Sequence, residues 1–178
     1  IPGASLETLL RKVGRVDLGT LAPVVLDAAR ALAYLHGRGV IHRDVKPANV
    51  LMQAEFPQDA PLDHAALARS EFVRGVLIDF GIATEVHRAG PHEGVTGTPG
   101  YIAPEVARGL DTVGPGVDVY SLAVVAFEML TGANPYLENQ SELNAVLVAH
   151  ATESPPWERL PQVQGRDALI ALLKDATR

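Results

Sequence analysis

The sequence predicts a single, mainly α domain: a helical bundle with small β hairpins. Its 178 residues are enough for one compact domain with its own hydrophobic core. Two long stretches, residues 21–36 and 117–130, have the apolar spacing typical of helices. The β-branched composition of strands is confined to short runs between them, which limits the expected sheet to small hairpins.

The N-terminal part of the chain is expected to hold two helices. Ser5 precedes Leu6 and further leucines at helical spacing, so Ser5 is the expected N-cap of a short amphipathic helix. In residues 21–36 an apolar side chain recurs every three or four positions, and Gly37 is the expected end of that second helix.

Three short strands are expected at residues 40–41, 50–52 and 73–78, because these runs are rich in Val, Ile and Leu. Residues 53–72 contain two prolines and charges of mixed spacing. This composition predicts a surface insertion with one possible helical turn at residues 63–69.

The rest of the chain divides into a loop and three helices. Residues 81–116 are dense in Gly and Pro, so we expect a long loop and no helix there. Residues 117–130 are apolar on nearly all sides of a helix, which predicts a buried central helix that ends at Gly132. Two further helices are expected at residues 141–151 and 165–176.

Composition excludes several classes of protein. With 47% hydrophobic and 20% charged residues the chain is not a disordered one. The net charge of −6 argues against a nucleic-acid-binding face. There is no cysteine for a disulfide or a thiolate metal site. The longest apolar run, residues 122–127, is far too short to span a membrane, so we expect no membrane segment and a cytoplasmic location.

Three motifs occur in a fixed order. Residues 42–49 read H-R-D-V-K-P-A-N, residues 79–81 read D-F-G, and residues 103–105 read A-P-E. With these motifs the chain resembles the C-terminal lobe of a serine/threonine protein kinase over essentially all of residues 1–178. Residues 79–105 would be its activation segment. The low lysine content and the abundance of Ala and Arg are similar to bacterial members of that family.

The resemblance implies ATP and Mg²⁺ as cofactors and assigns a role to four residues. Asp44 would take the proton of the substrate hydroxyl, and Lys46 would meet the γ-phosphate. Lys46 should point the same way as Asp44, because the two lie two positions apart in an extended loop. Asn49 and Asp79 would be ligands of Mg²⁺, a hard ion that prefers oxygen donors.

Residues 97–102 resemble the platform on which these kinases hold the protein substrate. Thr98 would bridge Asp44 and Lys46 through its hydroxyl, which is similar to serine/threonine kinases and not to tyrosine kinases; the alternative is a solvated turn residue. Asp118 has two interpretations, an N-cap of the buried helix and a carboxylate that holds the backbone of residues 42–43.

Four apolar residues would lie under the adenine ring of ATP by the same resemblance, or they belong simply to the core: Leu6, Leu51, Val125 and Met129.

The positive charge of Arg43 should be paired with an anion. We expect Glu93 to supply a permanent counter-charge, with phosphorylation of Thr96 as the alternative. The histidines have no ligand-like spacing, so they are expected to face solvent: His36, His87, His92 and His150.

The chain also departs from the family pattern. It contains no G-x-G-x-x-G loop and no V-A-x-K strand. We therefore expect the N-terminal kinase lobe to be a missing partner, and the 178-residue chain alone to be inactive. Glu105 resembles the residue that pairs with an arginine of the last helix, a role for which Arg178 is the candidate.

The expected function is ATP-dependent phosphorylation of Ser or Thr on protein substrates. One alternative is a binding module, a kinase-like scaffold or pseudokinase, although every catalytic position of this lobe is intact. The other is a small-molecule phosphotransferase, which shares the two Asp and the Asn. Such enzymes lack the counterparts of Lys46 and of residues 98–105, which makes this alternative the weaker one.

Overall fold

The computed structural model describes residues 3–54, 63–68, 70, 73–79, 84–85, 97–110, 113–138, 142–163 and 166–177. Its helices are α1 (Leu6–Val13), α2 (Leu18–His36), α3 (His64–Ala68), α4 (Pro104–Ala107), α5 (Gly116–Thr131), α6 (Leu143–Thr152) and α7 (Arg166–Ala176). Its strands are β1 (Ala4–Ser5), β2 (Val40–Ile41), β3 (Val50–Ala54), β4 (Val73–Leu77) and β5 (Thr84–Glu85). Single 3₁₀ turns are η1 (Pro47–Asn49), η3 (Pro99–Tyr101) and η4 (Trp157–Arg159).

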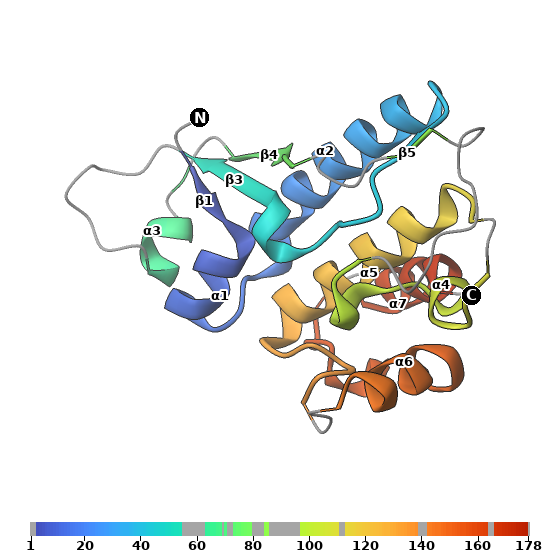
Figure 1. Cartoon of the computed structure of the whole chain (residues 1–178). Coiled ribbons are helices and arrows are strands. Elements are labelled where there is room, and N and C mark those ends of the chain that lie inside the picture. Colours follow the sequence, from blue (N-terminus) through green and yellow to red (C-terminus); the bar gives the residue numbers. More distant parts are fainter. Residues whose placement is uncertain are drawn as a thin grey trace.

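The elements form two halves around α5 (Figure 1). The antiparallel sheet β1-β3-β4 packs with α1 and α2 on one side of the molecule. Helix α5 packs against α2 and against α7, and α6 packs against α4. Most of α5 is buried, including Val125 and Met129 at 0% exposed, so the prediction of a buried central helix is confirmed.

Polar side chains define where the first two helices begin. The Ser5 hydroxyl accepts a hydrogen bond from the Thr8 amide (3.1 Å), as expected of an N-cap. Helix α2 begins at Leu18, three residues before the predicted start, because the Asp17 carboxylate accepts from the Thr20 amide (3.0 Å). The apolar repeat, on which the prediction rested, starts only at Leu21, so it could not reveal this cap.

Helix α2 has the length and mean hydropathy (1.4) of a membrane span, and in the described part of the chain it alone does. The sequence analysis did not single it out, because Asp27 and Arg30 interrupt its apolar run. One of its faces packs against β4 and α5 and buries Leu21, Val24 and Leu32. This packing favours a core helix.

All three predicted strands exist, but they pair over a wider area than the sequence indicated. Strands β3 and β4 pair from Val50–Leu77 to Ala54–Val73, so Gln53 and Ala54 are strand residues and not part of an insertion. Strands β1 and β5 are additional, pairing with β3 and β2. Helix α3 occupies the predicted helical turn, and its Leu67 is buried in the core.

The prediction that residues 81–116 contain no helix is wrong at two places. Turn η3 and helix α4 lie within this stretch, and each has a proline in its first turn. Proline is tolerated there because that amide has no partner inside the helix. The high proline content therefore concealed two helical starts.

Candidate active site

The loop between β2 and β3, residues 42–49, carries most of the expected site. Alternate residues of this loop are buried: Val45 is 1% exposed, and Pro47 is buried as well. The side chains of Asp44 and Lys46 remain 15% and 27% exposed. They therefore point the same way, as their spacing predicted.

Asp44, Lys46 and Thr98 form a closed triangle of contacts. The Lys46 ammonium lies 2.6 Å from Asp44 Oδ2 and donates to the Thr98 hydroxyl (3.1 Å). The Thr98 hydroxyl donates to Asp44 Oδ1 (2.6 Å). Thr98 thus makes the bridge expected of it, and residues 54 positions apart in the sequence meet at one carboxylate.

These contacts set the charge of Asp44. Burial alone would raise the pKa of this carboxyl group, but the hydrogen bonds from Lys46 and Thr98 and the charge of Lys46 outweigh it. The pKa of Asp44 is consequently below its ordinary value. Asp44 is an anion at neutral pH and is ready to accept a hydrogen bond from a hydroxyl group.

Strand pairing brings Asn49 next to Ile78, the residue that precedes Asp79. Directly beyond the β3–β4 pairing, the Ile78 amide donates to the Asn49 carbonyl (2.9 Å). The buried ring of His42 contacts the Ile78 carbonyl through Nε2 (3.2 Å). Ile78 is thereby held on both sides, which positions its exposed neighbour Asp79.

The donor set at Asn49 and Asp79 fits a magnesium ion. Asn49 Nδ2 donates to the Asp44 carbonyl (2.8 Å) and to Asp44 Oδ2 (3.0 Å), so the amide oxygen is the atom left for a metal. No group of three or more His, Cys, Asp or Glu that suits a metal occurs among the described residues. Mg²⁺ does not need one, because it commonly takes one or two protein ligands and completes its shell with phosphate oxygens and water.

Asp118 anchors the start of the loop from beneath. Its fully buried carboxylate accepts from the amides of His42 (2.9 Å) and Arg43 (2.8 Å), the contact expected of it. The N-cap interpretation is wrong, because α5 is capped at Pro115 and Asp118 lies inside its first turn. His36 at the end of α2 also contacts Asp118 Oδ2 (2.7 Å), so the expectation that this histidine faces solvent is wrong.

Arg43 and Asp79 are the two non-glycine residues with positive φ in the described part of the chain, at 67° and 64°. Such conformations are costly and persist where surrounding contacts impose them, often at functional sites. The Nε and Nη2 atoms of Arg43 are buried without a hydrogen-bond partner, which agrees with the expectation that an anion meets this side chain. The expected partners Glu93 and Thr96 lie outside the described residues, as do Phe80 and Arg178.

The platform, residues 97–102, is held mainly through the backbone of its central residues. The Ser121 hydroxyl donates to the Tyr101 carbonyl (2.6 Å), and Asn134 Nδ2 donates to the Gly100 carbonyl (3.0 Å). The Tyr101 hydroxyl donates to Glu128 (2.7 Å). A side chain at Gly100 would collide with Leu137, because an added Cβ would lie 2.7 Å from its Cδ1. The sequence analysis found the platform but none of the side chains that hold it.

The four residues expected under the adenine ring differ in burial. Leu6, Val125 and Met129 are at most 1% exposed and belong to the main hydrophobic core. Leu51, in β3, is partly exposed. The structure therefore favours the core interpretation for Leu6, Val125 and Met129, which support the site from beneath, and leaves Leu51 at the surface.

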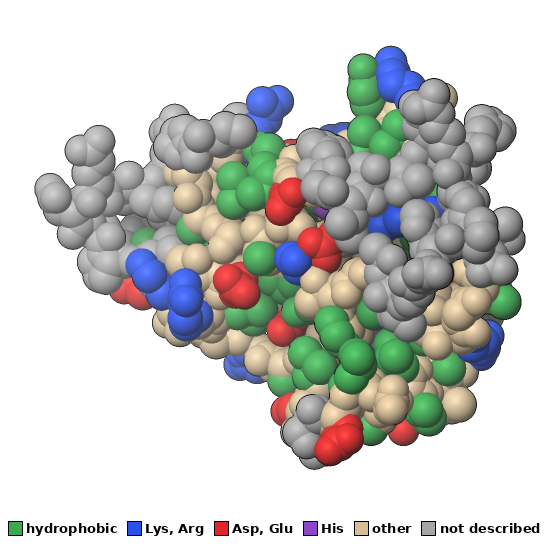
Figure 2. All heavy atoms as spheres, in the orientation of Figure 1, with side chains coloured by type: hydrophobic (Ala, Val, Ile, Leu, Met, Phe, Trp, Pro, Cys, Tyr) green, Lys and Arg blue, Asp and Glu red, His purple; other side chains and the backbone are tan. Residues whose placement is uncertain are grey.

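Figure 2 shows acidic and basic side chains side by side near the middle of one face, with hydrophobic side chains gathered below them.

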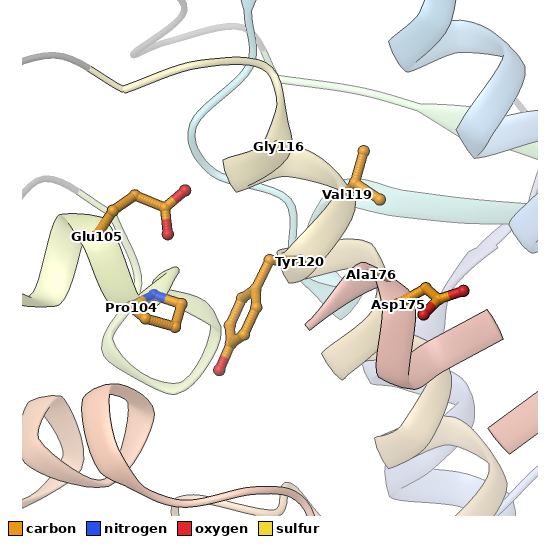
Figure 3. Close-up of a pocket in the computed structure, with 7 residues that line it drawn as sticks. All are labelled: Pro104, Glu105, Gly116, Val119, Tyr120, Asp175 and Ala176. Atoms are coloured by element: carbon orange, nitrogen blue, oxygen red, sulfur yellow. The ribbon is translucent and has the colours of Figure 1, made fainter. Parts of the chain in front are cut away.

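A cavity of about 240 Å³ lies elsewhere, between α4, α5 and α7 (Figure 3). Glu105, Tyr120 and Asp175 are among the residues that line it. His150, expected at the surface, is only 2% exposed and lies behind Tyr120, whose hydroxyl it contacts.

The comparisons with known proteins agree with this geometry. The family model described as "Protein kinase domain" matches residues 1–176. The chain is 37% identical over 156 residues to serine/threonine-protein kinase PkaB of Streptomyces coelicolor, an alignment that covers 86% of this chain and 34% of that protein. It is 33% identical over 159 residues to serine/threonine-protein kinase PknB of Mycolicibacterium smegmatis, covering 87% of this chain and 22% of that protein.

The similarity is not limited to bacteria. The human calcium/calmodulin-dependent protein kinase type IV is 36% identical over 142 residues, which cover 80% of this chain and 27% of that protein. The chain spans about a third of the length of the first curated relatives it matches. With a family match over nearly its whole length, this chain belongs to the protein kinase domain family.

Proposed function

We propose that this chain carries the catalytic loop of a protein kinase that phosphorylates Ser or Thr of protein substrates with ATP. The observation that carries the proposal is the triangle of Asp44, Lys46 and Thr98 next to Asn49 and Ile78. It joins an anionic acceptor, a cation and the Asn49 amide at one place, and Asp79 directly follows Ile78 in the chain. Phosphoryl transfer requires this combination, because catalysis there consists mainly of positioning and charge neutralisation.

Asp44 orients and deprotonates the acceptor. The substrate hydroxyl donates to the carboxylate, and its oxygen forms a bond to the γ-phosphorus of ATP. The bond between that phosphorus and the bridging oxygen breaks, ADP leaves with the electron pair, and the proton goes to Asp44. Mg²⁺ held by Asn49 and Asp79 neutralises phosphate charge when bound.

Lys46 couples the binding of the γ-phosphate to the pKa of Asp44. Without nucleotide its ammonium lies against Asp44 and helps to lower the pKa of that carboxyl group. When Lys46 turns to the γ-phosphate, this contact weakens and the pKa of Asp44 rises, which makes the carboxylate a better proton acceptor. The hydrogen bond from Thr98 keeps the carboxylate oriented meanwhile.

Radiolabel transfer from ATP to a protein substrate tests the proposal in the full-length protein. Asp44→Asn and Asp79→Asn should each lower the rate about 100- to 10,000-fold. A decrease of this size is the usual contribution of a general base and is larger than the loss of a single contact would cause. Asp63→Asn, which changes an exposed carboxylate beside α3, is the matched control and should leave the rate unchanged. Near-normal transfer by Asp44→Asn with an unchanged circular dichroism spectrum contradicts the assignment.

We also propose that the chain corresponds to the C-terminal lobe and works with an N-terminal lobe as its partner. The glycine-rich loop and the lysine that cover the phosphates in the family have no counterpart in these 178 residues. The 178-residue chain alone should then bind Mg-ATP weakly and transfer no phosphate, because one lobe cannot close over the nucleotide. Calorimetric titration checks this, and a low-micromolar dissociation constant would contradict the lobe assignment.

The alternatives separate in the same experiments. A scaffold or pseudokinase would bind its partner equally well with Asp44→Asn, and a small-molecule phosphotransferase would label a metabolite and no protein. The contact of Thr98 with Asp44 and Lys46 favours the protein kinase. We propose a cytoplasmic location for this domain, where ATP is available, and leave the identity of the protein substrate open.

A further inference from the structure

His150 is a buried polar residue that the proposed chemistry does not use. It lies on α6 and is 2% exposed. Its Nδ1 is 2.8 Å from the Tyr120 hydroxyl, and its ring lies on the Tyr136 ring with a centroid distance of 3.9 Å. Its Nε2 is buried and has no hydrogen-bond partner in the structure. An unpaired polar atom in the interior costs free energy, so its presence requires an explanation.

The substrate platform is packed beside this histidine. Helix α6 packs against η3, and the backbone groups that act on the His150 ring are those of Pro99 and Gly100. The Gly100 carbonyl already accepts from Asn134, and a backbone carbonyl oxygen has a second lone pair that can accept another hydrogen bond. A hydrogen bond from the His150 ring to that oxygen requires a proton on Nε2.

The surroundings determine which nitrogen carries the proton. A neutral imidazole has one N–H and one acceptor nitrogen. Carbonyl oxygens beside Nε2 favour the proton there, and Nδ1 then accepts from the Tyr120 hydroxyl. Burial lowers the pKa of His150 to about 4, more than the backbone groups of Pro99 and Gly100 raise it, so the ring is neutral at physiological pH.

We propose that His150 is a positioning residue for the protein substrate: its Nε2–H fixes the main-chain carbonyls of Pro99 and Gly100. This inference rests on the proposed function. In the free chain this interaction is weaker than a full hydrogen bond, since Nε2 has no partner within hydrogen-bond geometry, but the two backbone groups still act on the ring and raise its pKa. Its loss should therefore loosen the platform with or without substrate, and Tyr120 keeps the ring in the tautomer that can donate to the carbonyls.

Three substitutions separate this role from simple packing. His150→Phe keeps a ring but removes both nitrogens, and it is combined with Tyr120→Phe so that the Tyr120 hydroxyl is not left without its partner at His150. His150→Gln places an amide N–H close to the position of Nε2 and should restore the bond. Val146→Ala is the control: it also removes buried volume from α6, but it has no polar atom to offer the platform.

Kinetics of the full-length protein with a peptide substrate give the first readout. One lost hydrogen bond of about 1.4 kcal/mol corresponds to a tenfold change. The double Phe variant should therefore raise the KM for the peptide about tenfold and change the KM for ATP less than twofold. His150→Gln should stay within threefold of the wild type, and Val146→Ala should leave both KM values unchanged. An unchanged peptide KM in the double variant, or equal changes for ATP and peptide, would overturn the proposal.

A second readout needs no activity, so the inference and the proposed function can fail separately. Nitrogen NMR of the 178-residue chain should show His150 as the neutral Nε2–H tautomer from pH 8 down to pH 5. Hydrogen exchange of the amides in residues 98–103 should accelerate at least tenfold in the double variant and not in Val146→Ala. The opposite tautomer, or unchanged exchange, refutes the contact even if the enzyme is active. If the protein transfers no phosphate while tautomer and exchange behave as expected, the contact stands and the proposed function fails.

Discussion

The catalytic loop and the substrate platform meet at the same site but are held by different chemistry. The loop, residues 42–49, is held by carboxylates: Asp118 binds its backbone, and Asp44 is paired with Lys46. The platform, residues 97–102, is held mainly by neutral donors on its carbonyls, from Ser121 and Asn134.

This difference matches what each segment has to do. Charged partners can be exchanged, and under the proposed function Lys46 would leave Asp44 for the phosphate. Neutral hydrogen bonds to backbone carbonyls keep a shape whatever charges the ligand brings. The catalytic loop should therefore be sensitive to loss of charge, and the platform to gain of charge.

The largest effect should come from the buried carboxylate of the catalytic loop. Asp118→Ala leaves the amides of His42 and Arg43 buried without an acceptor, and we expect it to lower the free energy of unfolding by about 3–5 kcal/mol. Asp17→Ala removes a carboxylate that also holds a backbone amide, at the exposed start of α2, and should cost about 1 kcal/mol. Urea unfolding measures both. Equal losses would mean that burial does not distinguish the two carboxylates.

A second test adds a positive charge beside the platform, by lowering the pH until His150 is protonated. The pKa of His150 is about 4 in the folded protein, against 6.5 as the ordinary value. Between these values the unfolded chain binds more protons, so stability is intact above pH 6.5 and falls with decreasing pH, by up to about 1.4 kcal/mol per unit.

Urea unfolding of wild type and the His150→Phe, Tyr120→Phe double variant across pH 4.5–7.5 isolates this histidine. The free energy of unfolding of the double variant should fall less steeply as the pH decreases. The contact of His36 with Asp118 is present in both proteins, so it does not contribute to the difference. Parallel curves for the two proteins would show that His150 is not held neutral.

The smallest effect should come from the hydrogen bond between the platform residue Tyr101 and Glu128. Tyr101→Phe removes the hydrogen bond to Glu128, and we expect a loss of about 1–2 kcal/mol in the free energy of unfolding. Burial raises the pKa of Glu128 although the bond from Tyr101 opposes this, so the variant should raise that pKa further. Tyr34→Phe on the exposed face of α2 is the control. A change no larger than that of the control would show that the Tyr101 hydroxyl does not stabilise the platform.

The outcome of the sequence predictions follows from how local each signal was. Helices α2 and α5 were identified from their apolar repeat, which depends only on neighbours along the chain. Helix α4, with four residues, and strands β1 and β5, with two each, are too short for any repeat. Their existence depends on partners distant in sequence, such as the pairing of Ser5 with Leu51.

The same distinction applies to the site. Asp44, Lys46 and Asn49 were found because they lie within six consecutive residues, and Asp79 and Thr98 because they belong to neighbouring motifs. His36 and His150 were placed in solvent because their spacing along the chain carries no signal. Their partners are Asp118 and Tyr120, 82 and 30 positions away, and in the fold His36 is partly buried and His150 is buried.

The sequence by itself thus determined the class of fold, the order of the motifs and the residue types available for phosphoryl transfer. The tertiary structure alone decided that His36 contacts Asp118, that Ser121 and Asn134 hold the platform carbonyls, and that a buried histidine lies on α6 beside the platform. The physical reason is that helix periodicity and local motifs act over a few residues. Burial, charge pairing and the pKa of a group depend on whatever the fold brings within a few ångströms.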